Sequence, residues 1–170
     1  MILRPATTAD ALALAKLGAE TFIAAFGDLY TLDDLAAFLA EVHGETAVAA
    51  EIMGDSCTHR LVEIDGTLVA FCKLRHPSHY IAYSDARDPI ELGQLYALPG
   101  HTGSGIGAQL MDWALEVARE REHDAILLSV YAENFGAQRF YQRYGFGKIA
   151  DITFRVGEQL DPEFLYELKL

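Results

Sequence analysis

The fold is decided by one stretch of sequence, LYALPGHTGSGIGAQL, which covers residues 95–110. An apolar, β-prone run ends at Pro99, and glycines follow at every second position from 103 to 107. Apolar residues at helical spacing then predict an amphipathic helix over about 106–122. The first N–H groups of a helix have no partner within it, and glycine lets an anion approach the backbone closely. The stretch therefore predicts a phosphate-binding loop between a strand and a helix.

The residues around the glycines limit which kinds of phosphate ligand the loop could bind. No Gly-Lys-Ser/Thr follows them, which argues against a nucleoside-triphosphate loop. Gly103-x-Gly105-x-x-Ala108 fits a dinucleotide fingerprint, but residues 99–102 separate its first glycine from the strand. The first half of the chain also lacks a series of βαβ units. A nucleotide-dependent dehydrogenase is therefore the least supported alternative.

A second informative stretch begins with the apolar run 126–131, which predicts a buried strand. Asn134 is a favourable N-cap for the segment that follows. Apolar and aromatic residues recur at helical spacing over 137–144, and Gly145 suits the residue that ends a helix. A second strand–helix unit is therefore expected here.

Both stretches together resemble the GCN5-related N-acetyltransferase superfamily. The chain has a Gly-x-Gly-x-Gly/Ala loop and, about thirty residues later, Asn-x-x-Ala-x-x-Phe-Tyr-x-x-x-Gly-Phe over 134–146, each after a strand. The likeness covers roughly residues 58–155. Features within 21–27, 94–96 and 154–161 also resemble bacterial small-molecule acetyltransferases of the polyamine-acetylating type.

The resemblance implies one N-acetyltransferase domain over residues 1–170, of the α/β (α+β) class. It implies a twisted mixed sheet flanked by helices, with a splay between the central strands that holds acyl-CoA. A helical segment over about 8–54 would shape the acceptor side, and about 58–155 would form the CoA-binding core. Asp65-Gly66 independently predicts a two-residue hairpin turn. Further strands are expected at 1–5, 90–98, 146–156 and 164–170, with a long loop at 76–89.

The same resemblance implies acetyl-CoA as cosubstrate and no metal. Its pyrophosphate would lie on the backbone of Thr102, Gly103, Ser104, Gly105, Ile106, Gly107 and Ala108. The family usually has Gln or Arg at position 102, and threonine has less reach. Tyr96, Ala97 and Leu98 would line the pantetheine arm, and an N–H within 95–98 would stabilise the thioester oxygen. Asn134 would hold this region from the opposite strand, or serve only as an N-cap, or both.

Proton transfer needs an acid and a base. Tyr141 matches the family position that donates a proton to the departing thiolate; periodicity alone would make it a core aromatic. Glu91 is the leading candidate for the base, its alternative being a solvated edge-strand carboxylate. Alternatively, a water molecule could relay the proton to Glu91, Tyr80 or Tyr83, or the reaction could proceed without a base. Asp28, Asp33 and Asp34 could either bind a cationic amine or cap helices at the surface.

Charge and composition limit the partners. The formal net charge is −12, which argues against nucleic-acid binding because that needs a basic face. An acidic cleft would attract a cationic substrate, although acidity also serves solubility alone. Cys57 and Cys72 have neither metal nor redox spacing. With no signal peptide and no apolar run of membrane-spanning length, we expect a cytoplasmic protein without a membrane partner.

These observations predict an acetyl-CoA-dependent N-acetyltransferase that acts on a primary amine of a small molecule, polyamine-like amines among them. Transfer would be direct in a ternary complex, because no Cys or Ser has a plausible base neighbour. The alternatives are a protein N-terminal or lysine acyltransferase and a non-catalytic acyl-CoA-binding module. A homodimer is compatible with the resemblance.

Overall fold

The structure is a computed structural model that describes residues 1–170. Its seven strands form one sheet in the order β1-β2-β3-β4-β5-β7-β6. Neighbouring strands are antiparallel throughout, except for the parallel central pair β4 and β5. The strands are β1 (Ile2–Pro5), β2 (Cys57–Ile64), β3 (Thr67–Arg75), β4 (Ile90–Ala97), β5 (Ala125–Tyr131), β6 (Gly147–Val156) and β7 (Gln159–Lys169).

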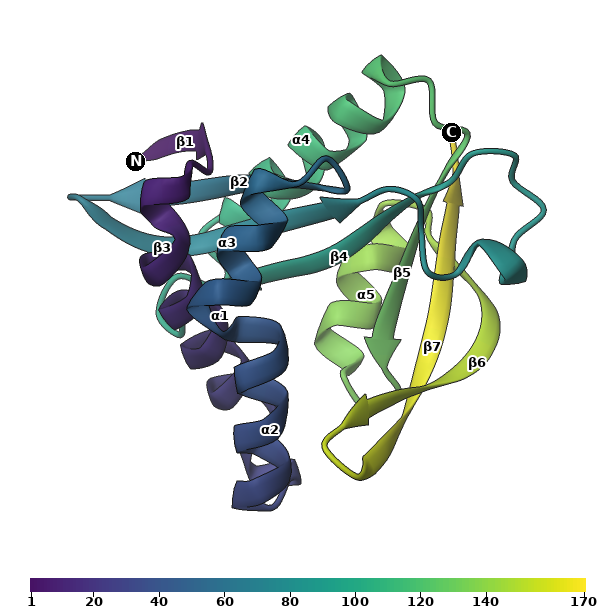
Figure 1. Ribbon diagram of the computed structural model, residues 1–170. Coiled ribbons are helices and arrows are strands. Elements are labelled where there is room, and N and C mark those ends of the chain that lie inside the picture. The colour runs from purple at the N-terminus through teal and green to yellow at the C-terminus, as the bar shows by residue number, and fades with distance from the viewer.

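Helices cover both faces of this sheet (Figure 1). The helices are α1 (Ala11–Phe26), α2 (Leu32–His43), α3 (Glu45–Met53), α4 (Ile106–Glu120) and α5 (Phe135–Arg143). α1 and α3 pack on the face that presents Leu61 and Phe71, whereas α4 and α5 pack on the opposite face against Val62 and Cys72. α2 reaches across to β6 through Phe38, which packs with Val156.

The larger core lies between the sheet and the pair α4 and α5. Leu110 and Ala114 of α4 are fully buried there, as are Ile126 of β5 and Ile90 of β4. Apolar residues on one stripe of α4 face this core, as the helical spacing predicts. This packing fixes the start of α4 against the end of β4, which positions the glycine loop.

The two central strands diverge soon after they begin. β4 and β5 pair only at Ile90↔Ile126 and Glu91↔Leu127. The β3–β4 register shifts just beyond, where Lys73 pairs with Gln94 and the next pair joins two leucines, so Gly93 is an extra residue in β4. Such a bulge bends its strand. Beyond this point the facing edges of β4 and β5 are not paired with each other.

The expected mixed α/β sheet is confirmed, and so is the hairpin turn, where Asp65 and Gly66 have φ of 50° and 79°. The last strand is longer than expected, because β7 begins at Gln159 rather than at residue 164. Pro162 is tolerated inside it since its backbone faces Ala132, whose N–H donates to the Pro162 carbonyl just past the end of β5. The missing N–H thus falls outside the ladder with β6. α4 ends at Glu120, two residues early.

Candidate functional site

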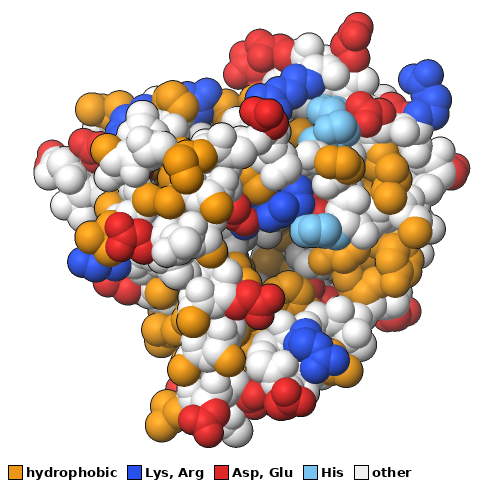
Figure 2. Space-filling view, in the orientation of Figure 1, with side chains coloured by type: hydrophobic (Ala, Val, Ile, Leu, Met, Phe, Trp, Pro, Cys, Tyr) orange, Lys and Arg blue, Asp and Glu red, His pale blue; other side chains and the backbone are white.

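A cleft of about 610 Å³ opens where β4 and β5 diverge. The space-filling view shows a hollow there, with hydrophobic walls and charged side chains at its rim (Figure 2). β4, α1 and α2 supply much of the wall, and β6 adds Phe154. Its aromatic members are Phe22, Phe26, Tyr30, Phe38, Tyr80, Tyr96, Tyr131, Tyr141 and Phe154.

The glycine loop beside this cleft presents unused hydrogen-bond donors. None of the backbone N–H groups from Thr102 to Ala108 donates to an acceptor within the protein. Gly103 and Gly105 have φ of 75° and 85°, and an added Cβ on either would meet no atom within 4 Å. Gly105 is also the N-cap of α4. A helix start with free N–H groups and open space in front suits the pyrophosphate of CoA.

The end of β4 forms one wall of the cleft. Tyr96 and Ala97 line it, and so does Thr102 at the start of the loop. Leu98 does not line the cleft, because it packs against the α1 and α3 core and its N–H donates to the Val69 carbonyl at 2.9 Å. The segment expected to hold the pantetheine arm is therefore only partly open to the cleft.

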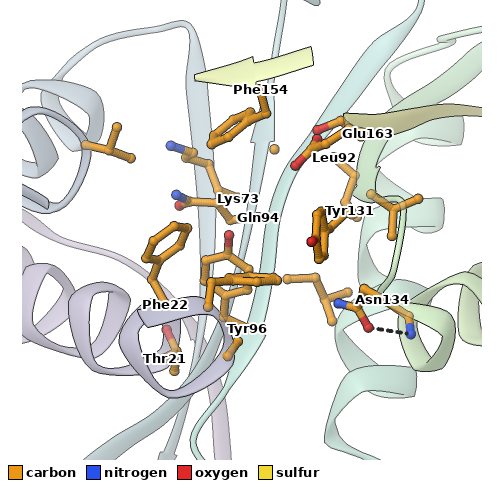
Figure 3. A pocket seen from close by; sticks show the side chains of 18 of the residues that line it. Thr21, Phe22, Lys73, Leu92, Gln94, Tyr96, Tyr131, Asn134, Phe154 and Glu163 are labelled. Carbon is orange, nitrogen blue, oxygen red and sulfur yellow. Dashed lines mark hydrogen bonds between the residues drawn. The ribbon is translucent and has the colours of Figure 1, made fainter. Parts of the chain in front are cut away.

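Asn134 lies on the opposite wall, after β5 (Figure 3). Its side-chain oxygen accepts a hydrogen bond from the Ala137 N–H at 3.1 Å, so the N-cap role is real. The side-chain amide nitrogen makes no hydrogen bond within the protein and remains available. The turn itself is held by buried Gln138, whose amide donates to the carbonyls of Tyr131 and Ala132 at 3.1 and 2.9 Å. Sequence reasoning did not single out Gln138.

Tyr141 serves both the core and the cleft. Its ring packs against Phe140 and Phe146, with centroid distances of 5.4 and 5.8 Å, and its side chain also lines the cleft. The hydroxyl makes no hydrogen bond within the protein. Burial raises the pKa of Tyr141, with smaller contributions from Cys72 and Tyr96, so the phenol holds its proton. A protonated, unused hydroxyl in the cleft can donate to a leaving group.

Glu91 lines the cleft, but its carboxylate is occupied. Oε2 accepts hydrogen bonds from the His79 N–H at 2.8 Å and from the Ser78 hydroxyl at 3.3 Å. The His79 imidazole lies 3.4 Å from the same oxygen. In the structure Glu91 thus anchors the loop that joins β3 to β4. Tyr80 of this loop also lines the cleft, whereas Tyr83 does not.

A second occupied carboxylate is Glu51 of α3. It lies 3.0 Å from the Lys73 amine and 2.8 Å from the Arg75 guanidinium, and His59 is 3.5 Å away. Burial opposes its ionisation, but His59, Lys73 and Arg75 together lower the pKa of Glu51 to about 2. The two cleft cations are thus held by a carboxylate of the protein.

Glu163 is the carboxylate that sequence reasoning missed. It lies on β7 directly opposite Tyr131 of β5 and lines the cleft. Its Oε2 atom is buried and has no hydrogen-bond partner, and no Lys, Arg or His nitrogen lies within 4 Å of the carboxylate. Burial raises the pKa of Glu163 from 4.5 to about 7; the Ser129 hydroxyl opposes this and Asp161 adds to it.

The acidic residues at the start of α2 lie elsewhere. None of Asp28, Asp33 and Asp34 lines the cleft. Asp34 belongs to the N-terminal cap of α2, since its N–H donates to the Thr31 hydroxyl at 3.2 Å. Its carboxylate also accepts the Glu158 N–H at 2.7 Å. Of the two roles open to it from sequence, Asp34 takes the capping one.

A separate polar cluster lies outside the cleft. Asp88 joins two imidazoles, with His76 Nε2 at 2.7 Å from one carboxylate oxygen and His123 Nδ1 at 2.9 Å from the other. One ligand atom from each residue lies within 4.8 Å of the other two, which is close enough for a transition-metal ion. Without a metal, the same contacts hydrogen-bond the loop between β3 and β4 to the loop between α4 and β5.

Comparison with known proteins agrees with this geometry. The family model described as "Acetyltransferase (GNAT) family" matches residues 21–146. An uncharacterized N-acetyltransferase of Mycobacterium bovis is 32% identical over 157 residues, covering 92% of this chain and 95% of its own. One from Lactobacillus delbrueckii subsp. lactis is 27% identical over 153 residues, covering 89% and 87%.

Solved structures share the fold. The PaiA N-acetyltransferase of Thermoplasma acidophilum, in complex with coenzyme A, has a TM-score of 0.81 at 20% identity, over 99% of this chain and 98% of that one. A putative acetyltransferase of Salmonella typhimurium, solved with acetyl-CoA, has a TM-score of 0.68 at 20% identity, over 100% and 94%. The chain belongs to the GNAT family of acetyltransferases. It is an acetyl-CoA-dependent N-acetyltransferase, and none of its helices has the length and apolar character needed to cross a membrane.

Proposed function

We propose that this acetyltransferase modifies a primary amine of a small molecule by direct transfer in a ternary complex. The observation that carries the proposal is the position of the cleft between two sets of free groups. On one side lie the unpaired N–H groups of 102–108, and on the other lies an aromatic chamber that contains the buried Oε2 atom of Glu163, which has no hydrogen-bond partner. The reacting groups would meet where β4 leaves β5.

Acetyl-CoA supplies an acyl group already activated as a thioester. The loop N–H groups would bind its pyrophosphate, and the amide of Asn134 would hold the adjoining arm from the β5 side. The unpaired β4 edge offers N–H groups for a thioester oxygen as it gains charge. The Tyr141 hydroxyl holds a proton for the departing sulfur.

The acceptor chamber favours a cation. Phe22 packs against Phe38 and Tyr30 with centroid distances of 4.5 and 5.9 Å, and Phe154 lies 5.7 Å from Phe38. Aromatic faces attract ammonium groups, more strongly where water is excluded. An enclosed chamber of this kind suits a small amine better than it suits an amine on a flat protein surface. The unused Tyr141 hydroxyl supports catalysis over a role that only binds acyl-CoA.

The test is an amine panel with acetyl-CoA, in which free thiol and acetylated amine are both measured. It should include 1,4-diaminobutane, single amino acids and short peptides with free N-termini. We expect equal amounts of thiol and N-acetylated small amine. Acetylation of peptides alone would favour the protein-modifying alternative. Tight acetyl-CoA binding with no acetylation of any acceptor would favour the binding module.

A further inference from the structure

We propose that Glu163 is the site at which the acceptor ammonium binds and the group that takes its first proton. This inference rests on the proposed function, because it names the residue that the amine meets in the cleft. It assigns the base to β7 rather than to Glu91 of β4. Glu163 then contacts the reacting nitrogen and is a catalytic residue.

The first support is the balance of charge in the cleft. Glu51 holds Lys73 and Arg75, and Glu91 is held by the loop around His79. Glu41 lines the cleft but is exposed. Glu163 remains as the one cleft carboxylate with a buried oxygen, Oε2, that has neither a hydrogen-bond donor nor a cation beside it. A buried charge without a partner is costly, and an incoming ammonium would remove that cost.

The second support is the position of Glu163 among the aromatic side chains. Figure 3 shows its carboxylate pointing into the cleft beside Tyr131, with Phe154 nearby and Lys73 on the opposite side. Ser129, two residues before Tyr131 on β5, lines the same cleft, and its hydroxyl acts to lower the pKa of Glu163. A carboxylate framed by aromatic rings suits an ammonium ion, which gains from both.

The third support is the set of charges around Glu163. From its own strand it faces Asp161, which accepts hydrogen bonds from Tyr30 and from Gln159 and is thus already satisfied. From the surrounding elements it faces the phenols of Tyr30, Tyr80 and Tyr96. No cation of the protein competes for it, and its raised pKa, about 7, suits a base that works near neutral pH.

The protons balance as follows. The ammonium gives one proton to the Glu163 carboxylate, from which it passes to solvent. The neutral nitrogen forms a C–N bond to the acetyl carbonyl carbon while the C–S bond breaks. The departing sulfur takes the Tyr141 proton, and the second proton lost by the nitrogen restores the phenol. Each acetylation therefore yields an amide and a thiol and releases one proton.

The test compares Glu163→Gln with Glu167→Gln, a matched control. Glu167 lies four residues along the same strand, outside the cleft, and its carboxylate already contacts Ser84 and Lys169. With 1,4-diaminobutane, Glu163→Gln should lower kcat/KM by about 10²–10⁴-fold and remove the rise with pH near 7. The control should keep the wild-type profile. A wild-type profile in Glu163→Gln would overturn the proposal.

A pair of probes separates proton transfer from mere shape. Ethylamine is an ammonium ion at pH 7, whereas 2,2,2-trifluoroethylamine of similar size is mostly neutral. If Glu163 takes a proton, the loss in Glu163→Gln should be at least about tenfold smaller with the fluorinated amine. Equal losses with both amines would overturn the assignment of proton transfer to Glu163.

A binding measurement keeps the outcome separate from that of the proposed function. Calorimetric titration of 1,4-diaminobutane into the CoA complex should show binding to wild type and at least about tenfold weaker binding to Glu163→Gln. If the amine binds in this way but is never acetylated, the proposed function would be contradicted while the ammonium site at Glu163 would stand. Equal affinities, or no binding to wild type, would overturn the site.

Discussion

The carboxylate of Asp34 accepts a hydrogen bond from the backbone N–H of Glu158 at 2.7 Å. Asp34 lies in the first turn of α2 and Glu158 in the turn between β6 and β7, 124 residues later. The contact ties the helical cover of the cleft to the hairpin that carries Glu163. Together with the packing of Phe38 on Phe154, it links the two halves of the chain that form the chamber.

Gly157→Ala should break this tie. Gly157 has φ of 58°, and an added Cβ would lie 2.2 Å from the Asp34 carboxylate and 2.5 Å from the Asp34 Cα. We expect unfolding to be easier by about 2–4 kcal/mol in urea titrations, and the KM for the amine to rise. Gly66→Ala is the control, because Gly66 also has positive φ but open space around it. Equal stability losses in the two variants would contradict the role of the tie.

Gly105→Val should weaken acetyl-CoA binding, because a branched side chain would stand in front of the free N–H groups. Strain at φ of 85° will also cost stability, by about 1–2 kcal/mol. Gly66→Val introduces similar strain, at φ of 79°, in the distant β2–β3 turn. Calorimetry should therefore show weaker acetyl-CoA binding in Gly105→Val alone. Unchanged affinity in a folded Gly105→Val protein would place the pyrophosphate elsewhere.

Glu163→Gln should stabilise the protein at alkaline pH. Burial raises the pKa of Glu163 from 4.5 to about 7, so between these values the folded state holds a proton that the unfolded state releases. Wild-type stability therefore falls as pH rises through this window, and the neutral variant avoids the loss. The difference should grow from near zero at pH 4 to at most about 3 kcal/mol at pH 8. Urea unfolding at both pH values measures it, and a variant less stable than wild type at pH 8 would refute the argument.

Acetyl-CoA should raise the melting temperature far more than NAD or ATP at equal concentration. Binding to the folded state alone stabilises it by mass action, and the loop lacks the lysine of nucleoside-triphosphate sites. Thermal denaturation with each ligand provides the comparison. Equal or greater stabilisation by NAD would count against the assigned cosubstrate.

Local sequence was enough to predict the glycine loop, the N-cap at Asn134 and the hairpin turn at Asp65-Gly66. Each depends on the conformation of a few adjacent residues or on a regular apolar spacing. Gly105 needs a positive φ, and Asn134 bonds to a residue three positions away, so both leave a local pattern.

Glu163 and the Asp34 contact left no such pattern. The importance of Glu163 arises from its register opposite Tyr131 and from the helices that shield it, and both depend on contacts distant in sequence. Glu91 shows the converse case: its place on β4 was predicted, but its hydrogen bonds to Ser78 and His79 depend on how a long loop folds back.

The central claim is that catalysis occurs at the splay of β4 and β5, with Tyr141 as the acid. The most direct measurement is kcat of Tyr141→Phe at saturating acetyl-CoA and amine, with Tyr144→Phe, at the C-cap of the same helix, as the control. The phenylalanine ring retains the contacts with Phe140 and Phe146, so stability and acetyl-CoA affinity should change little. We predict that kcat falls by about 10²–10⁴-fold in Tyr141→Phe and stays near wild type in Tyr144→Phe. A wild-type kcat in Tyr141→Phe, with chemistry shown to be rate-limiting, would contradict the claim.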